Sequence, residues 1–118
     1  MKKITIILLI CFIPIINNFY LDGAKGQFFK IIFQPTTLFA QKYTDNNFKK
    51  IKNGTSANEV IELIGYPLYT QVIKFGEYNG NIKWFWTKSS NDSHYSIRAI
   101  IFDAKSNVIN KIAYYYID

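Results

Sequence analysis

The feature that most constrains the fold is a change of hydrophobic period at Gly65-Tyr66-Pro67. Before it, apolar residues recur three and four apart, as on one face of a helix: Ala57, Val60, Ile61 and Ile64. From Tyr69 onward apolar and polar side chains alternate, which is the period of a half-buried strand. Glycine tolerates a left-handed cap and proline cannot continue a helix, so the chain is expected to pass from helices to strands here.

Two short helices are expected before this point. Ser56 is a candidate N-cap and Glu59 follows three residues later, so a capping box predicts that one helix begins there. A shorter helix, which ends at Asn53-Gly54, is predicted from the spacing of Phe48 and Ile51. Helices of this length need tertiary packing to persist, so both are expected to lie on a sheet.

The strands are expected after Pro67, over residues 69–75, 82–87, 95–102 and 108–117. Asn79-Gly80 is a strong hairpin signal, residues 88–94 are predicted to form a polar loop, and residues 103–107 a turn. Short connections favour antiparallel pairing. The predicted fold class is therefore α+β, with two short N-terminal helices packed on a three- to four-stranded antiparallel sheet and preceded by an apolar N-terminal segment.

The apolar N-terminal segment follows Lys2 and Lys3 and covers residues 4–16. Its thirteen residues suit the apolar region of a signal peptide, whereas a helix that spans a bilayer needs about 20. Residues 1–40 are therefore expected to be a signal peptide or a membrane anchor with a linker, and residues 41–118 the folded domain. The positive flank predicts export of the rest of the chain to the cell envelope.

Cys11 lies inside the apolar run and raises lipidation as a further alternative. A lipidated cysteine follows a small residue, whereas Ile10 is large, so the sequence favours Cys11 as an apolar residue of a hydrophobic helix. Ala40 before Gln41 is a candidate cleavage site that lies late for a signal peptide. Removal, lipidation and retention of the leader all stay open, and a single cysteine excludes an internal disulfide.

The charge of the expected domain excludes little but disfavours nucleic acid as a partner. Residues 41–118 hold ten basic and seven acidic residues, a surplus of three that is ordinary for a soluble surface. Nucleic-acid binding usually shows a dense basic stripe, so none is expected, whereas loose attraction to an anionic membrane surface fits. No phosphate-binding loop or metal-ligand spacing is found, so no cofactor and no metal are expected.

Candidate catalytic residues are few. His94 lies in the polar loop and would need a partner to act as a base, so a solvated histidine is the simpler interpretation. Glu59 and Glu62 are neighbours on the expected helix, but paired carboxylates do acid–base work only when burial separates their pKa values. Asp103 ends a strand before a turn, where it is expected to cap the backbone. The sequence therefore predicts a protein that is not an enzyme.

Several residues occur in the order of a known family pattern. They are Ile51, Gly54, Ser56, Val60, Gly65-Tyr66-Pro67, Trp84-Phe85-Trp86, Phe102-Asp103 and Val108. Residues 48–116 resemble the SmpA/OmlA/BamE family of outer-membrane assembly lipoproteins in this ordered set. The pattern departs from the family at Asn107, where glycine is usual, and at the poor lipidation motif around Cys11. Asparagine also tolerates the left-handed conformation, so the first departure is mild.

The resemblance implies two helices on a small antiparallel sheet and an accessory role in assembling β-barrel proteins into the outer membrane. It also implies a protein partner in the envelope, within the barrel-assembly machinery, and Gly54, Ser56, Val60, Gly65, Pro67, Phe102 and Asp103 as structural positions. Related folds serve as inhibitors that bind β-lactamases. The alternative is therefore a membrane-tethered or secreted inhibitor that binds an enzyme.

Surplus aromatic residues are the candidate protein-binding site: Trp84, Trp86, Tyr95, Tyr114 and Tyr116. Helices cover only one face of a sheet, and tyrosine and tryptophan on the other would suit a protein partner. The alternative is that most of them pack in the core or in cross-strand pairs. The alternation predicts that Phe85 and Tyr115 face opposite to Trp84, Trp86 and Tyr114, and it leaves open which set is exposed.

Overall fold

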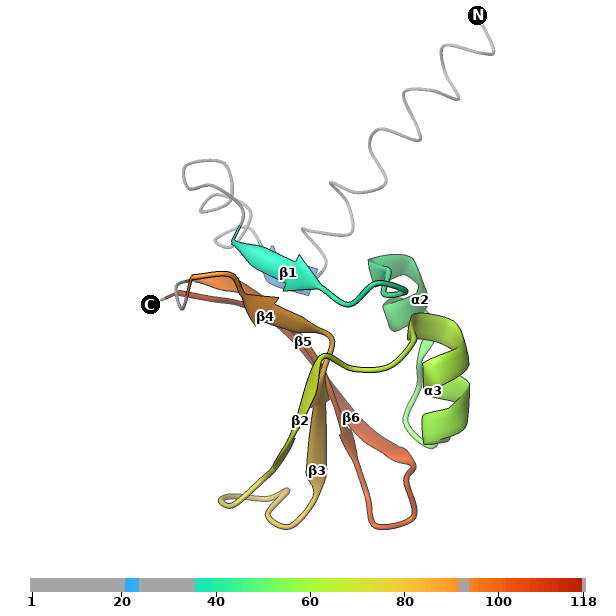
Figure 1. The fold of residues 1–118 in the computed structure, drawn as a ribbon. Helices are drawn as coiled ribbons and strands as arrows, with labels where there is room; N and C mark the ends of the chain where they lie inside the picture. The colour runs from blue at the N-terminus through green and yellow to red at the C-terminus, as the bar shows by residue number, and fades with distance from the viewer. Residues whose placement is uncertain (1–20, 24–35, 92–93, 118) are drawn as a thin grey trace, which may run out of the picture.

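The computed structural model describes residues 21–23, 36–91 and 94–117, and it has an α+β fold (Figure 1). Residues 21–23 are helical. The remaining elements are β1 Thr37–Phe39, α2 Asp45–Lys50, α3 Ala57–Ile64, β2 Tyr69–Val72, β3 Ile82–Phe85, β4 Thr87–Ser89, β5 Tyr95–Phe102 and β6 Val108–Tyr116. The expected fold class is confirmed at this level, and a second small sheet is added to it.

Local capping signals set the limits of both helices. In α2 the Thr44 side chain accepts a hydrogen bond from the Asn47 amide, and the helix ends three residues before Asn53-Gly54. In α3 the Ser56 Oγ accepts from the Glu59 amide at 3.2 Å, and Gly65 caps the other end, as the sequence predicts. The side chain at an N-cap satisfies a backbone donor that the helix itself leaves free.

The main sheet is antiparallel, with its strands in the order β2-β3-β5-β6. The Asn79-Gly80 signal lies in the connection from β2 to β3, where Gly80 adopts a φ of 91°. The predicted strand over residues 82–87 is divided, because β3 ends at Phe85 and β4 leaves to pair with β1. Lys88 and Ser89, which were expected in a loop, belong to β4 for the same reason.

The helices pack on one face of this sheet (Figure 1). Phe48 of α2 and Val60 and Ile64 of α3 join Ile100 and Phe102 of β5 in the larger core cluster. A second, smaller cluster of Phe85, Ile97 and Ala99 is formed by sheet residues alone. Since successive side chains of a strand point to opposite faces, the two clusters lie on opposite sides of the sheet.

The folded part begins before residue 41. The Ala40 amide donates to the Trp86 carbonyl, and β1 just before it pairs with β4 over three residues. Leu21 and Asp22 are also buried against the sheet. The apolar run over residues 4–16 and Cys11 lie outside the described residues. Within the described ranges, no helix combines the length and the hydropathy that crossing a bilayer requires.

A bulge corrects one predicted face. Strict alternation along residues 108–117 would place Val108 on the same side as Ile112, Tyr114 and Tyr116. In the structure Ile101 pairs with Asn110 while Phe102 pairs with Val108, so β6 has one extra residue at this point. An extra residue reverses the side to which the preceding side chain points, and Val108 therefore packs in the larger cluster on the helix side.

Candidate protein-binding site

The face of the main sheet that points away from α2 and α3 is here called the open face. The strand register assigns to it Tyr69, Gln71, Lys83, Phe85, Tyr95, Ile97, Ala99, Ile101, Asn110, Ile112, Tyr114 and Tyr116. Residues directly opposite each other on neighbouring strands share a face, as Tyr69, Phe85, Ala99 and Ile112 do across all four strands. Five of these side chains are aromatic, so the open face is a broad aromatic surface.

Cross-strand contacts hold these rings in place. Tyr69 stacks on Phe85 with 4.4 Å between ring centroids, and Tyr95 lies 5.9 Å from Tyr116. The residues Tyr69, Tyr114 and Tyr116 nevertheless stay 40%, 45% and 41% exposed, respectively. Rings that are fixed by their neighbours and still reach solvent lose little entropy when a partner covers them, so this surface is suited to binding.

The electrostatics of the open face follow from partial burial. Burial first, and then the neighbouring Tyr95 hydroxyl with its hydrogen bond, raises the pKa of Tyr69 to about 12. Burial, with smaller contributions from Tyr95 and Tyr116, also raises the pKa of Tyr114. Lys83 lies 4.9 Å above the Phe85 ring, and burial lowers its pKa. Tyr69 and Tyr114 therefore hold their protons to a higher pH than an ordinary tyrosine, on the same face as the amine of Lys83.

Three of the five candidate residues, Tyr95, Tyr114 and Tyr116, lie on the open face, and the two tryptophans do not. Trp86 is fully buried in the larger cluster, where its Nε1 donates to the Gly65 carbonyl at 3.0 Å. Trp84 is partly buried beside it, with its ring 4.5 Å from that of Phe102. A partner that approaches the open face therefore does not meet either indole.

The predicted division of aromatic residues between the faces is corrected as well. Phe85 shares the open face with Tyr114, and Tyr115 points to the helix side with Trp84. Apart from Val108 at the bulge, alternation within each strand was predicted correctly. Which side chains of different strands share a face depends on the pairing register, because a slip of one residue exchanges the two faces. The pattern of a single strand does not encode that register.

The family-pattern residues serve structural purposes in this fold. Gly54 and Gly65 have φ values of 93° and 76°, in the left-handed region, and Pro67 follows the end of α3. Ser56 caps α3, Val60 is fully buried in it, and Phe102 is buried at the end of β5. The Asp103 Oδ1 accepts from the Lys105 and Asn107 amides at 2.9 and 3.0 Å, so Asp103 caps the turn before β6.

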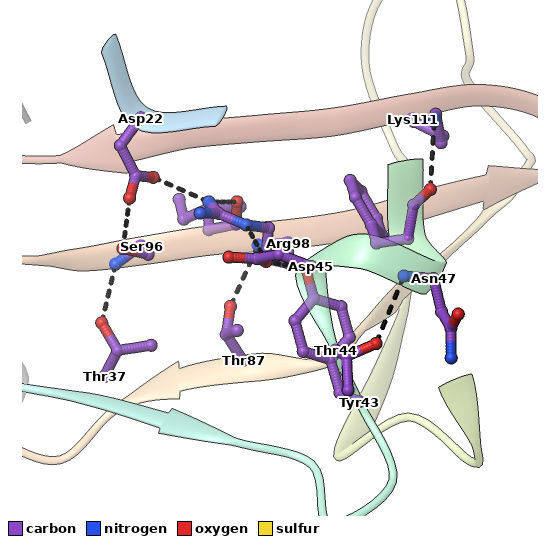
Figure 2. A network of polar contacts seen from close by, with 12 residues as sticks. Asp22, Thr37, Tyr43, Thr44, Asp45, Asn47, Thr87, Ser96, Arg98 and Lys111 are labelled. Carbon is purple, nitrogen blue, oxygen red and sulfur yellow. Dashed lines mark hydrogen bonds and ion pairs between the residues drawn. The ribbon is translucent and has the colours of Figure 1, made fainter. Parts of the chain in front are cut away.

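A buried arginine network was missed by sequence reasoning (Figure 2). The fully buried Arg98 donates from Nη1 to the Asp22 Oδ1 at 2.7 Å and from Nε to the Asp45 Oδ1 at 3.0 Å. Ser96 donates to the other Asp22 oxygen, and the Tyr43 hydroxyl donates to Asp45. The signal in the sequence was an arginine at a core-facing position of a mostly apolar strand, which requires a buried counter-charge.

The Arg98 network has a structural role. Burial lowers the pKa of Arg98, but its hydrogen bond to Asp22 and the charge of that carboxylate outweigh this effect and raise it overall. Burial, followed by the charge of Asp45, raises the pKa of Tyr43. The carboxylates come from residues 21–23 and from α2, so the ion pairs join two segments to β5.

The candidate catalytic residues are not brought together. His94 precedes β5 with its ring 6.2 Å from that of Tyr115, while Glu59 and Glu62 lie on α3. No group of three histidine, cysteine, aspartate or glutamate side chains placed to hold a metal ion occurs in the part of the chain that the structure describes.

A comparison of the chain with protein-family models, curated proteins and solved structures finds no match.

Proposed function

We propose that this protein is a non-enzymatic binding or scaffold module of the cell envelope that is exported through its N-terminal segment and tethered there to a membrane. The open face is its partner-binding surface. The resemblance to the SmpA/OmlA/BamE family supports a more specific role, as an accessory factor in the assembly of β-barrel proteins into the outer membrane. The partner would then be a protein of the barrel-assembly machinery.

The observation that carries this proposal is the aromatic composition of the open face. Tyr69, Tyr95, Tyr114 and Tyr116 lie there beside Phe85 and Ile112, and none of the described helices packs over them. Tyrosine-rich surfaces bury a large apolar area and still offer hydroxyl groups for hydrogen bonds, which is why they are enriched where proteins meet. An apolar face of this kind favours a binding role.

The arrangement of the chain also supports a tether that leaves the hairpin end of this surface free. Residues 21–23 and β1 lie at one end of the molecule, and the β2–β3 and β5–β6 hairpins point to the other end (Figure 1). An N-terminal membrane segment would therefore attach at the β1 end. The β2–β3 and β5–β6 hairpins, with the Tyr69, Gln71 and Lys83 end of the open face, would extend away from that membrane toward a partner.

A site-specific crosslinking experiment tests the partner. A photoreactive phenylalanine analogue replaces Tyr114 on the open face in the full chain, which is expressed in a Gram-negative host. The matched control carries the same analogue at Asn58, which is exposed on α3 at the other face. We expect the first variant to crosslink to a component of the barrel-assembly machinery, and the control to give no such product.

Other crosslinking outcomes bear on the same proposal. Equal crosslinking from both positions, or none from Tyr114 at matched expression, would contradict a specific partner surface. A single crosslink to a hydrolase, together with saturable inhibition of that hydrolase, would replace the assembly role with that of an inhibitor.

Membrane fractionation with mass spectrometry of the mature N-terminus tests the location. We expect the full chain in an envelope membrane. A lipidated Cys11 in the outer membrane would support the assembly role most directly. Intact protein in the soluble cytoplasmic fraction would contradict the envelope location, and a soluble periplasmic product that begins at Gln41 would contradict the tether.

A further inference from the structure

A hollow lies beside the connection between β2 and β3. It has a volume of about 630 Å³ and is lined by Gln71, Val72, Ile73, Lys74, Phe75 and Lys83. Gln71 and Lys83 are directly paired on the open face, so the hollow continues the open face toward the hairpin. It is thus placed where a partner bound to the aromatic surface would reach the end of the sheet.

The charge of this hollow is unbalanced. Lys74 and Lys83 both line it, and the ion pairs among the described residues all belong to Arg98. Burial lowers the pKa of Lys83, so its charge is partly removed from water without a carboxylate beside it. A carboxylate that entered the hollow would offset this desolvation and form charge-assisted hydrogen bonds with both ammonium groups.

The surroundings of the two lysines are apolar and exposed. Val72 is 55% exposed and Phe75 is 86% exposed, although both have side chains that a core normally buries. Isolated exposed apolar residues are common, but here they flank the same hollow as the cations. The site therefore suits a ligand in which an acidic group lies next to apolar groups.

The free edge of β2 adds a backbone element to this site. β2 is the first strand of the order β2-β3-β5-β6 and is exposed along its whole length. The Ile73 amide donates to the Asn81 carbonyl, on the side of β3. In an antiparallel pair, only every second residue of a strand forms hydrogen bonds with a given neighbouring strand. Thr70 and Val72 therefore point their N–H and C=O groups away from β3, where an extended chain can pair with them.

We propose that the β2 edge and the hollow together bind an extended acidic segment of a protein partner, in which carboxylate side chains alternate with apolar ones. The proposal deepens the binding role and rests on the proposed function. The backbone of the segment pairs with Thr70 and Val72, a carboxylate enters the hollow between Lys74 and Lys83, and apolar side chains cover Val72 and Phe75.

The position of the hairpin favours a protein segment over an anionic lipid. The hairpin lies at the opposite end of the molecule from residues 21–23 and β1, which lead to the N-terminal segment (Figure 1). A membrane that holds the N-terminus therefore lies away from Lys74 and Lys83. Lipid headgroups also offer no strand to pair with the edge of β2.

Peptide binding to the full chain, in discs of zwitterionic lipid, tests the proposal. The probe is a fluorescent eight-residue peptide in which aspartate alternates with valine, and its control has asparagine in place of aspartate. One charge-assisted contact is worth about ten-fold in affinity, so we expect the asparagine peptide and the Lys83→Gln variant each to bind about ten-fold more weakly. Lys88→Gln, at an exposed position on β4, is the matched control and should bind as the parent does.

A second pair of variants separates backbone pairing from side-chain contact. Val72→Pro removes an N–H that points to solvent, so the native sheet keeps its hydrogen bonds while the added strand loses one. Val72→Thr keeps that N–H and removes apolar surface. We expect Val72→Pro to weaken binding more than Val72→Thr does, and equal effects would overturn the strand-pairing geometry.

Other results of the peptide, vesicle and crosslinking experiments would overturn this proposal or the proposed partner surface. Equal binding of the two peptides, or unchanged binding by Lys83→Gln, would overturn the proposal. It would also be overturned if phosphatidylglycerol vesicles bound in a manner that depends on Lys83 while the acidic peptide did not bind. Crosslinking from Tyr114 without peptide binding would remove this inference alone, whereas peptide binding without a Tyr114 crosslink would remove the proposed partner surface alone.

Discussion

Gly65 joins several parts of the fold at the scale of a single residue. It ends α3 with a φ of 76°, and its carbonyl accepts the hydrogen bond from the buried Trp86 indole. A Cβ built on it would lie 2.8 Å from the Lys42 Cβ, closer than side-chain carbons normally approach. Both the backbone conformation and the available space therefore require glycine at this position.

Substitution of Gly65 tests that requirement. A strained backbone conformation costs about 1–3 kcal/mol, and the contact with Lys42 adds to it, so Gly65→Ala should lose about 3 kcal/mol of unfolding free energy. Gly54→Ala is the control, since φ is 93° there and nothing lies within 4 Å of the added methyl group. It should lose about 1 kcal/mol, as urea unfolding followed by tryptophan fluorescence will measure. Equal losses would show that the Lys42 contact relaxes freely.

At the scale of elements, a segment that precedes the expected domain completes the structure. Residues 21–23 bring Asp22 to the buried guanidinium of Arg98, and Ser96 of the same strand donates to Asp22. Next along the chain, β1 pairs with β4, and the Thr37 hydroxyl accepts from the Ser96 amide at 2.9 Å. A sheet edge and a buried charge therefore both depend on residues N-terminal to position 41.

Removal of the Asp22 carboxylate tests this dependence. Asp22→Ala leaves Arg98 buried with one carboxylate in place of two, and breaking a buried ion pair costs about 3–5 kcal/mol. We expect a loss of about 3 kcal/mol, at the lower end of this range, because Asp45 remains. Glu62→Ala, at an exposed carboxylate on α3, should change the unfolding free energy by less than about 0.5 kcal/mol in the same denaturant titration. Similar losses in the two variants would contradict the structural role of residues 21–23.

At the scale of the whole molecule, tyrosines contribute to both faces of the sheet. Burial is the main cause that raises the pKa of Tyr43 and Tyr115 on the helix side and of Tyr69 and Tyr114 on the open face. A tyrosine with a raised pKa holds its proton more firmly when folded. Its contribution to stability is complete below pH 10, the ordinary pKa, and is lost as the pH rises through the folded value.

Stability is therefore expected to fall above about pH 10, through the range in which these tyrosines ionise. Lys83 and Lys111 act in the opposite direction, because burial lowers their pKa values and the loss of their charge removes a penalty. Their two contributions should offset those of the four tyrosines only in part. Tyr69→Phe should reduce the fall in denaturation midpoint between about pH 10 and 12, the range between the ordinary and the folded pKa of Tyr69. An unchanged slope in that variant would contradict the assigned environment of Tyr69.

The elements that the sequence predicted well are those with local signals. Ser56 and Gly65 marked both ends of α3, and the β-rich runs that became β5 and β6 were bounded by turn residues. The α+β class and the antiparallel order followed from the change of period and the short connections. Capping, turn chemistry and alternation depend on a few neighbouring residues, so the sequence by itself determined these features.

The tertiary structure decided which side chains lie on each face of the main sheet and which other segments of the chain complete the fold. The burial of Trp86, the exposure of Tyr114 and the turning of Val108 toward the helices depend on strand register and on one bulge. The pairing of β1 with β4 and the ion pair from Asp22 to Arg98 join residues that are far apart in the sequence. Such contacts form only when the whole sheet is assembled, because the partner of a strand edge or of a buried charge is supplied by another part of the chain.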